Sequence, residues 1–183
     1  MANPVADARP AGQGRLRDNA RMQIRLIATG GTFDKTYDPL TGALGFAATH
    51  LERIVARVRL TVPVAIEVPM LIDSLDMTDA HRQAVLDACR RAPEPHLVIV
   101  HGTDTMAQTA RVLGAAALPA TIVLTGAMVP YDVADSDALF NLGYAFACAQ
   151  HLPAGVWVAM NGRVHPWGDV RKNRDKGVFE ATG

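Results

Sequence analysis

Leu97-Val98-Ile99-Val100 is an uninterrupted apolar run that stands between Pro95 and Gly102. A strand that is apolar at every position is buried on both faces, which is typical of parallel sheets. The sequence predicts four more strands that are mostly apolar, at residues 24–28, 64–68, 121–124 and 156–160. Together these runs predict a sheet that is mostly parallel.

Helical patterns alternate with the predicted strands. Apolar residues recur with helical spacing in residues 50–59, and Thr78 is a suitable N-cap for a helix over residues 79–91. Further helices are expected at 105–116 and from Asp135 or Ser136 to 150. Strands that alternate with helices form βαβ units. The expected fold is therefore α/β, a three-layer sandwich with a flavodoxin-like sheet, in one domain over residues 23–183.

Composition narrows the class of protein. The 183 residues are 49% hydrophobic and 20% charged, and 18 Lys+Arg balance 18 Asp+Glu. This balance argues against bulk attraction to nucleic acid or to an anionic membrane. Residues 1–22 lack the apolar run of a secretory signal, and we expect a flexible N-terminal extension there. We therefore expect a cytoplasmic protein with neither a nucleic-acid nor a membrane partner.

Cysteine and histidine spacing gives no sign of a metal site. Cys89 and Cys148 are not in C-x-x-C spacing and are expected to be reduced, partly buried thiols, although the sequence leaves a disulfide open. The six histidines show no ligand spacing. His101 is expected to close the third strand by packing or hydrogen bonding, with a direct catalytic role as the alternative.

Threonine and glycine occur together just after three of the predicted strands, in Thr29-Gly30-Gly31-Thr32, at 101–106 and at 125–130. Ligands of open α/β sheets bind beyond the carboxyl ends of the strands. Glycine allows close backbone approach, and a threonine hydroxyl can bind a ligand or act as a nucleophile. The same residues are common in ordinary turns, so chemistry alone leaves a structural role open.

Several of these segments resemble a known family. Ala28-Thr29-Gly30-Gly31-Thr32 and His101-Gly102-Thr103-Asp104-Thr105-Met106 resemble the two signature segments of bacterial-type L-asparaginases. The resemblance runs in order from about residue 23 to 176. It also includes the segments 73–77, 124–128, 136–142 and 169–172.

The resemblance implies a set of catalytic residues. Thr32 would attack the substrate amide, form an acyl-enzyme and release ammonia, with Tyr37 as the candidate for the tyrosine that partners it. Thr103, Asp104 and Lys172 would form a second catalytic group. A threonine hydroxyl is a poor nucleophile at neutral pH and needs a nearby base, which a desolvated lysine can supply.

The resemblance also implies how the substrate is bound. Ser74 and Asp104 would hold the α-carboxylate and α-amino groups, and the Ala127 carbonyl would face the leaving amide nitrogen. Neither a metal nor an organic cofactor is required. The full set of implied substrate-binding residues is Gly31, Ser74, Leu75, Gly102, Thr103, Asp104 and Ala127.

The sequence departs from the family pattern in three respects. The second, C-terminal asparaginase domain is expected to be absent, and with it the acidic residue that this domain supplies to a neighbouring subunit. Leu75 stands where glutamine is usual, and Val129 stands where arginine is usual. We therefore expect weaker substrate binding than in long-chain members.

Three functions remain open from the sequence. The first is an L-asparaginase that converts L-asparagine to L-aspartate and ammonia as a homodimer or homotetramer. The second is the amidase subunit of a tRNA-dependent amidotransferase, which would need partners. The third is a non-catalytic amino-acid-binding protein. Retention of Thr32, Thr103, Asp104 and Lys172 favours an enzyme.

Overall fold

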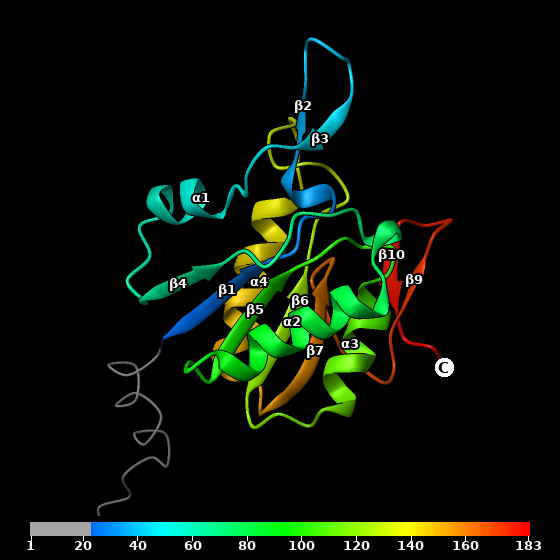
Figure 1. The fold of residues 1–183 in the computed structure, drawn as a ribbon. Coiled ribbons are helices and arrows are strands. Elements are labelled where there is room, and N and C mark those ends of the chain that lie inside the picture. The colour runs from blue at the N-terminus through cyan, green and yellow to red at the C-terminus, as the bar shows by residue number, and fades with distance from the viewer. Residues whose placement is uncertain (1–22) are drawn as a thin grey trace, which may run out of the picture.

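A six-stranded sheet forms the centre of the computed structural model, which describes residues 23–183 (Figure 1). The predicted extension at 1–22 lies outside the described residues. The strand order is β4-β1-β5-β6-β7-β8, and all neighbours are parallel except β7 and β8. The first five follow the flavodoxin-like order, as expected. Their bounds are Val64–Glu67 (β4), Ile24–Ala28 (β1), His96–Val100 (β5), Thr121–Thr125 (β6), Gly155–Met160 (β7) and Arg163–Pro166 (β8).

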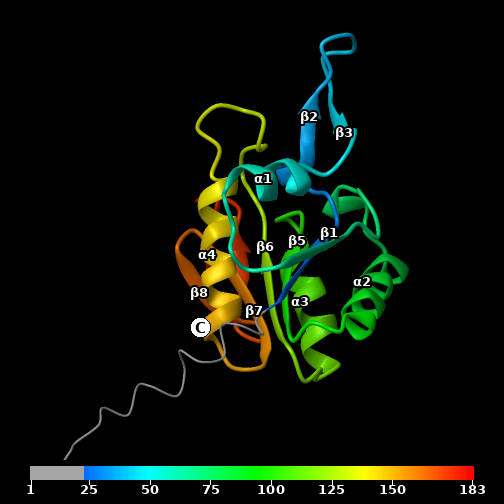
Figure 2. The same cartoon turned by 90° about the vertical axis from the view of Figure 1, so that its left-hand side faces the viewer.

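Helices cover both faces of the sheet and complete the predicted three layers (Figure 2). Helices α1 (Leu51–Arg57) and α4 (Ala138–His151) lie on one face. Helices α2 (Asp79–Arg91) and α3 (Met106–Ala115) lie on the other. The expected α/β sandwich is therefore confirmed.

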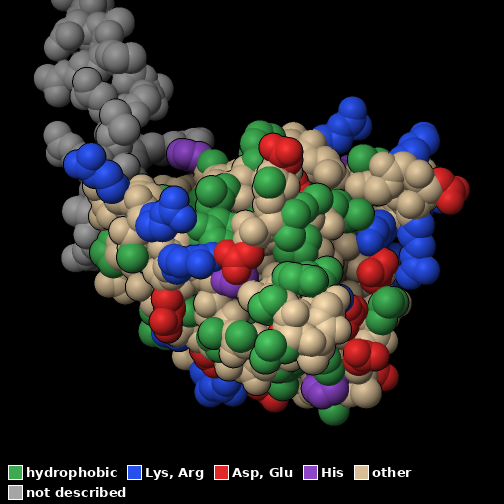
Figure 3. Space-filling model, turned by 90° about the horizontal axis from the view of Figure 1, so that it is seen from above, with side chains coloured by type: hydrophobic (Ala, Val, Ile, Leu, Met, Phe, Trp, Pro, Cys, Tyr) green, Lys and Arg blue, Asp and Glu red, His purple; other side chains and the backbone are tan. Residues whose placement is uncertain are grey.

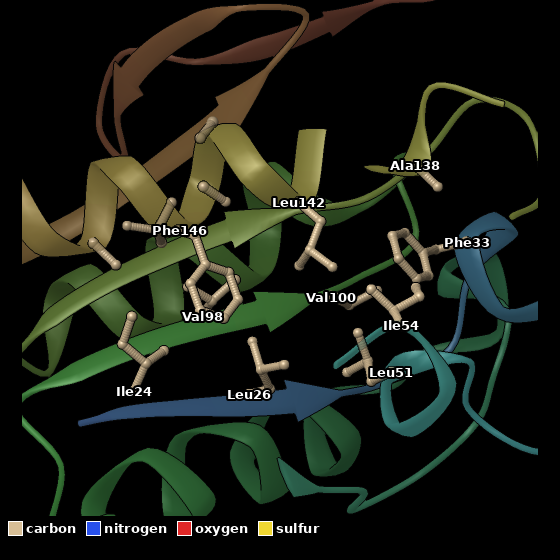
Figure 4. Packing of buried hydrophobic residues seen from close by; sticks show 14 of the residues in the cluster. Ile24, Leu26, Phe33, Leu51, Ile54, Val98, Val100, Ala138, Leu142 and Phe146 are labelled. Atoms are coloured by element: carbon tan, nitrogen blue, oxygen red, sulfur yellow. The ribbon is translucent and has the colours of Figure 1, made fainter. Parts of the chain in front are cut away.

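The apolar strands supply a core to each face. Leu26 and Val98 pack with Leu142 and Phe146 of α4 in one buried cluster (Figure 4). Ile27, the next residue of β1, belongs to the second cluster, beneath α2 and α3. Alternate strand residues point to opposite faces, so a strand covered on both sides is apolar at most positions. The exception in β1 is Arg25, which forms ion pairs with Glu67 and Glu94.

The bounds of α2 match the prediction, and its N-terminal capping residues explain where it begins. The Thr78 hydroxyl accepts from the His81 backbone N–H at 3.4 Å, and the Thr78 N–H donates to His81 Nδ1 at 3.1 Å. This reciprocal pair is a capping box in which histidine takes the usual place of Glu or Gln.

Glycine, threonine and aspartate in residues 29–45 predict a loop between the first strand and the first helix, and this prediction was wrong. This segment contains the short helix η2 (Thr32–Asp34) and a hairpin of β2 (Lys35–Tyr37) and β3 (Leu44–Phe46). The hairpin projects beyond the sheet (Figure 1). At its base, the Asp34 carboxylate accepts from the His50 backbone N–H at 2.9 Å and from the Thr49 hydroxyl at 3.1 Å. Burial raises the pKa of Asp34.

The last part of the chain also forms strands that the sequence did not predict. After β8, a second hairpin pairs β9 (Arg171–Asn173) with β10 (Val178–Glu180). Phe179 lies opposite Lys172 in this pairing and is buried. Its side chain anchors the hairpin that carries Lys172.

Both cysteines are free and buried, Cys89 in α2 and Cys148 in α4. Burial raises the pKa of both thiols, that of Cys89 to about 12. Within residues 23–183, no cluster of side chains suits a metal ion. No helix in this part of the chain has the length and apolar character needed to cross a membrane.

Candidate active site

Loops that follow β1, β5 and β6 meet at the carboxyl edge of the sheet, where ligands of open α/β sheets bind. Seen from above, basic and acidic side chains are interspersed at the β9–β10 side of this end (Figure 3). The predicted site residues lie on these loops, on the β2 strand, on β9 and on the short helix η3 (Ser74–Asp76).

Two glycines bring the first two of these loops into contact. A Cβ atom on Gly31 would lie 2.2 Å from Gly102 Cα, which is too close for any side chain. Gly31 also has a φ of 70°, a backbone conformation that favours glycine. Thr32 and Thr103 directly follow these glycines. The structure therefore places the two predicted threonine segments side by side.

Ser74 completes this meeting point from a third loop. A Cβ atom on Gly102 would lie 2.5 Å from Ser74 Oγ, and the Ser74 side chain is buried. The Thr105 hydroxyl donates to the Ser74 carbonyl at 2.8 Å. Gly102 is thus in contact with both Gly31 and Ser74, and all three are predicted to bind substrate.

Lys172 joins the second predicted catalytic group. Its Nζ donates to Thr103 Oγ1 at 2.7 Å and to Asp104 Oδ1 at 3.0 Å. The Lys172 side chain is only 12% exposed. Arg174 Nη2 lies 3.8 Å from the same Asp104 oxygen, which therefore faces two basic side chains. The structure brings together the hydroxyl, the amine and the carboxylate that the sequence proposed as one group.

The loop after β6 is fixed by buried polar groups. Asn141 Nδ2 donates to the Gly126 carbonyl at 3.1 Å and to Asp137 Oδ2 at 2.8 Å. The Asp137 carboxylate also accepts from the backbone N–H groups of Met128 and Val129. Ala127, at the centre of this loop, is buried. Asp137 and Asn141, both in the segment 136–142, therefore hold the loop after β6 in place.

Tyr37 and Leu75 are not joined to this cluster. Tyr37 lies on β2 and is 58% exposed, and in residues 23–183 no hydrogen bond links its hydroxyl to Thr32. The Leu75 side chain is 62% exposed, and only its backbone N–H is engaged, donating to Asp73 Oδ1 at 3.0 Å. The catalytic assignment of Tyr37 stays a prediction.

Sequence reasoning missed an ion pair at the edge of the site. Lys35 Nζ donates to Asp73 Oδ2 at 2.6 Å, which ties the base of the β2–β3 hairpin to the loop of Ser74. The lysine holds the pKa of Asp73 below its usual value, and Lys172 adds a smaller effect in the same direction. No local spacing signals this pair, because its members are far apart in the chain.

His101 has a structural place beneath the site. Its Nδ1 lies 2.8 Å from the Gly102 carbonyl and its Nε2 lies 2.8 Å from Thr109 Oγ1. The ring is fully buried, and this burial lowers the pKa of His101 to about 4. The geometry agrees with the expectation that His101 closes the third strand by hydrogen bonding.

This burial predicts an acid-dependent loss of stability. The folded-state pKa lies below the ordinary value of 6.5, so the unfolded chain binds the proton more readily. The stabilising contribution is complete above about pH 6.5 and is lost progressively as the pH falls towards 4, by roughly 3 kcal/mol. Urea unfolding of the wild type and of His101→Gln should therefore give a stability difference that shrinks between pH 7.5 and 5. A difference independent of pH would contradict this.

The fold and the polar cluster together define an α/β protein that carries hydroxyl, amine and carboxylate groups at the carboxyl edge of its sheet. The sequence matches the family described as "Asparaginase, N-terminal" over residues 23–179. The chain belongs to this asparaginase family of amidohydrolases, and the resemblance drawn from its motifs is confirmed.

The chain is similar to amidotransferase subunits in sequence and to L-asparaginases in structure. One subunit of the glutamyl-tRNA(Gln) amidotransferase of Aeropyrum pernix is 33% identical over 168 residues, which cover 87% of this chain and 39% of that protein. The corresponding subunit from Methanococcus maripaludis is 33% identical over 80% of this chain and 37% of its own length.

Among solved structures, the thermostable L-asparaginase from Thermococcus kodakarensis superposes with a TM-score of 0.79 at 26% identity. L-asparaginase I from Vibrio cholerae superposes with a TM-score of 0.75 at 28% identity. Each alignment covers 87% of this chain and 51% of the solved chain. The chain therefore spans about half the length of these structures and about two fifths of the curated relatives.

Proposed function

We propose that residues 23–183 form one asparaginase-type domain that hydrolyses L-asparagine to L-aspartate and ammonia. The observation that carries the proposal is the Lys172 amine, which contacts both Thr103 Oγ1 and Asp104 Oδ1 beside the Gly31–Gly102 contact. Amide hydrolysis through a threonine acyl-enzyme uses a hydroxyl nucleophile, a proton acceptor and a group that orients the acceptor. These three kinds of group are the ones that this edge of the sheet collects.

The proposed reaction proceeds through an acyl-enzyme. Thr32 Oγ attacks the side-chain amide carbon, its proton passes to the amide nitrogen, the C–N bond breaks, and the nitrogen leaves as ammonia. Water then attacks the ester carbonyl and gives a proton through Thr103 Oγ1 to the neutral amine of Lys172, which returns it to the Thr32 oxygen as the ester bond breaks. Tyr37 would partner Thr32 after the β2–β3 hairpin closes on the substrate, since apo geometry need not show a catalytic hydrogen bond.

Substrate binding in this proposal uses the neighbouring loops. The buried Ser74 hydroxyl would donate to the α-carboxylate, and Asp104 would accept from the α-amino group. The Ala127 carbonyl would accept from the amide nitrogen. The exposed Leu75 side chain offers this substrate no polar contact. Binding weaker than in members with glutamine at this position therefore remains part of the proposal.

Purified protein tests the proposal directly. Ammonia should be released from L-asparagine without any added protein, RNA or metal, and a coupled glutamate dehydrogenase assay measures it continuously. L-Glutamine and D-asparagine in the same assay define the side-chain length and stereochemistry that the site accepts. Sedimentation of the same sample tests the proposed homodimer or homotetramer.

The similarity to amidotransferase subunits favours a second candidate. In this case the chain would release ammonia for a partner that amidates an acyl-tRNA, and hydrolysis of free asparagine would be slow until the partner is present. A large rise in ammonia release on adding an amidotransferase partner would support this candidate. Full activity of the isolated chain supports the asparaginase proposal.

A further inference from the structure

Lys35 is the lysine nearest in sequence to the proposed nucleophile, three residues after Thr32. It begins β2 and ends η2, and its backbone N–H donates to the Thr32 carbonyl. This hydrogen bond holds the start of the Lys35 side chain one short turn away from Thr32.

The Lys35 ammonium reaches the loop that holds Ser74. It donates to Asp73 Oδ2 at 2.6 Å, and Asp73 is the residue directly before Ser74. The other oxygen of Asp73 accepts from the Leu75 backbone N–H at 3.0 Å. Asp73 is thus held on both sides, and it fixes the ammonium at one position beside the binding loop.

This ammonium retains hydrogen-bonding capacity. A lysine ammonium has three N–H donors, and among the described residues its only hydrogen bond is the one to Asp73. The Lys35 side chain is 23% exposed, so its remaining donors lie in a partly covered position. A charged donor that is partly removed from water is well suited to a ligand carboxylate.

The binding loop itself lacks a second polar contact for such a carboxylate. Ser74 offers one hydroxyl, and the next side chain, Leu75, is apolar and exposed. A carboxylate has two oxygens and binds most strongly where both accept charge-assisted hydrogen bonds. Lys35 is the cation that lies beside this loop on the hairpin side.

We propose that Lys35 binds the α-carboxylate of the substrate together with Ser74, and so restricts the enzyme to amides that carry a free α-carboxylate. This inference rests on the proposed asparaginase function. Asp73 acts as a positioning residue, because it contacts Lys35 and would not touch the substrate. The expected kinetic signature is a rise in KM, since the carboxylate is bound equally in the ground state and the transition state.

The test compares two substrates in wild type and Lys35→Met. One is L-asparagine, and the other is β-alaninamide, which is the same molecule without its α-carboxylate. We expect the substitution to lower kcat/KM for L-asparagine by about 10- to 100-fold, mainly through KM, because a hydrogen bond to a charged group is lost. Activity on β-alaninamide should change less than about 2-fold, because this substrate has no carboxylate to lose. Lys35→Arg should restore part of the preference.

Arg111→Met provides the matched control, since it removes an exposed cation from α3 and should leave both substrates unaffected. If Lys35→Met does not fold, Lys35→Gln keeps a donor for Asp73 without the charge and carries the same comparison. An equal loss on both substrates would overturn the inference and assign Lys35 a purely structural role. A wild-type protein that neither hydrolyses L-asparagine nor binds L-aspartate would instead overturn the proposed function, and this inference with it.

Discussion

Thr32→Ala is expected to lower kcat for L-asparagine by about 10⁴-fold or more, because it removes the hydroxyl that forms the acyl-enzyme. The alanine should fit without strain, since residue 32 is only partly buried and its backbone already follows the η2 turn. Circular dichroism and thermal unfolding should therefore match the wild type. Steady-state ammonia release measures the loss.

Thr32→Ser is the control for this prediction, because it keeps a hydroxyl at the same atom and should retain measurable turnover. Mass spectrometry after rapid quenching should detect a covalent adduct of aspartyl mass in the wild type and none in Thr32→Ala. Wild-type rates in Thr32→Ala would exclude Thr32 as the nucleophile. The search for the nucleophile would then move to Thr103, the neighbouring hydroxyl that contacts Lys172.

Lys172→Met is expected to reduce kcat by about 10²- to 10⁴-fold, the usual range for loss of a general acid–base. The substitution keeps most of the side-chain volume but leaves Thr103 Oγ1 and Asp104 without the amine that they share. Arg174 remains near Asp104 at 3.8 Å and preserves part of its charge balance. The loss should therefore appear in catalysis more than in folding, as measured by kinetics and urea unfolding.

Lys176→Met is the matched control, because it removes a lysine from the same β9–β10 hairpin at an exposed position. It should leave kcat within about 2-fold of the wild type, as surface changes away from the site usually do. Equal losses in Lys172→Met and Lys176→Met would indicate that the hairpin matters only as a structural element.

The sheet could be predicted from sequence because its parallel strands are short, mostly apolar and separated by helices with clear periodicity. Burial on both faces forces this pattern on β1 and β5, and Thr78 marks the start of α2 through its cap. The hairpins could not be predicted in the same way. Each of β2, β3, β9 and β10 has three residues, which is too short for an alternating pattern to be distinguished from a loop.

The candidate site, too, could be predicted only in part from the sequence. The Thr103–Asp104–Lys172 group could be proposed because each residue lies in a recognisable motif, and the structure brings its members together. The Lys35–Asp73 pair depends on how the hairpin is seated over a distant loop, and such long-range geometry leaves no local trace in the sequence. Tyr37 was proposed from the resemblance, as the tyrosine that follows Thr32. It lies exposed on the β2–β3 hairpin, and its catalytic role stays a prediction.

The two concealed thiols make this chain convenient for site-directed labelling. Cys89 and Cys148 are at most 8% exposed, and their raised pKa values leave little thiolate to react with a maleimide. Leu40, at the tip of the β2–β3 hairpin, is 94% exposed. A Leu40→Cys variant would therefore accept a single fluorophore without removal of either natural cysteine. Its emission would report, in real time, whether this tip changes surroundings when an amino acid binds.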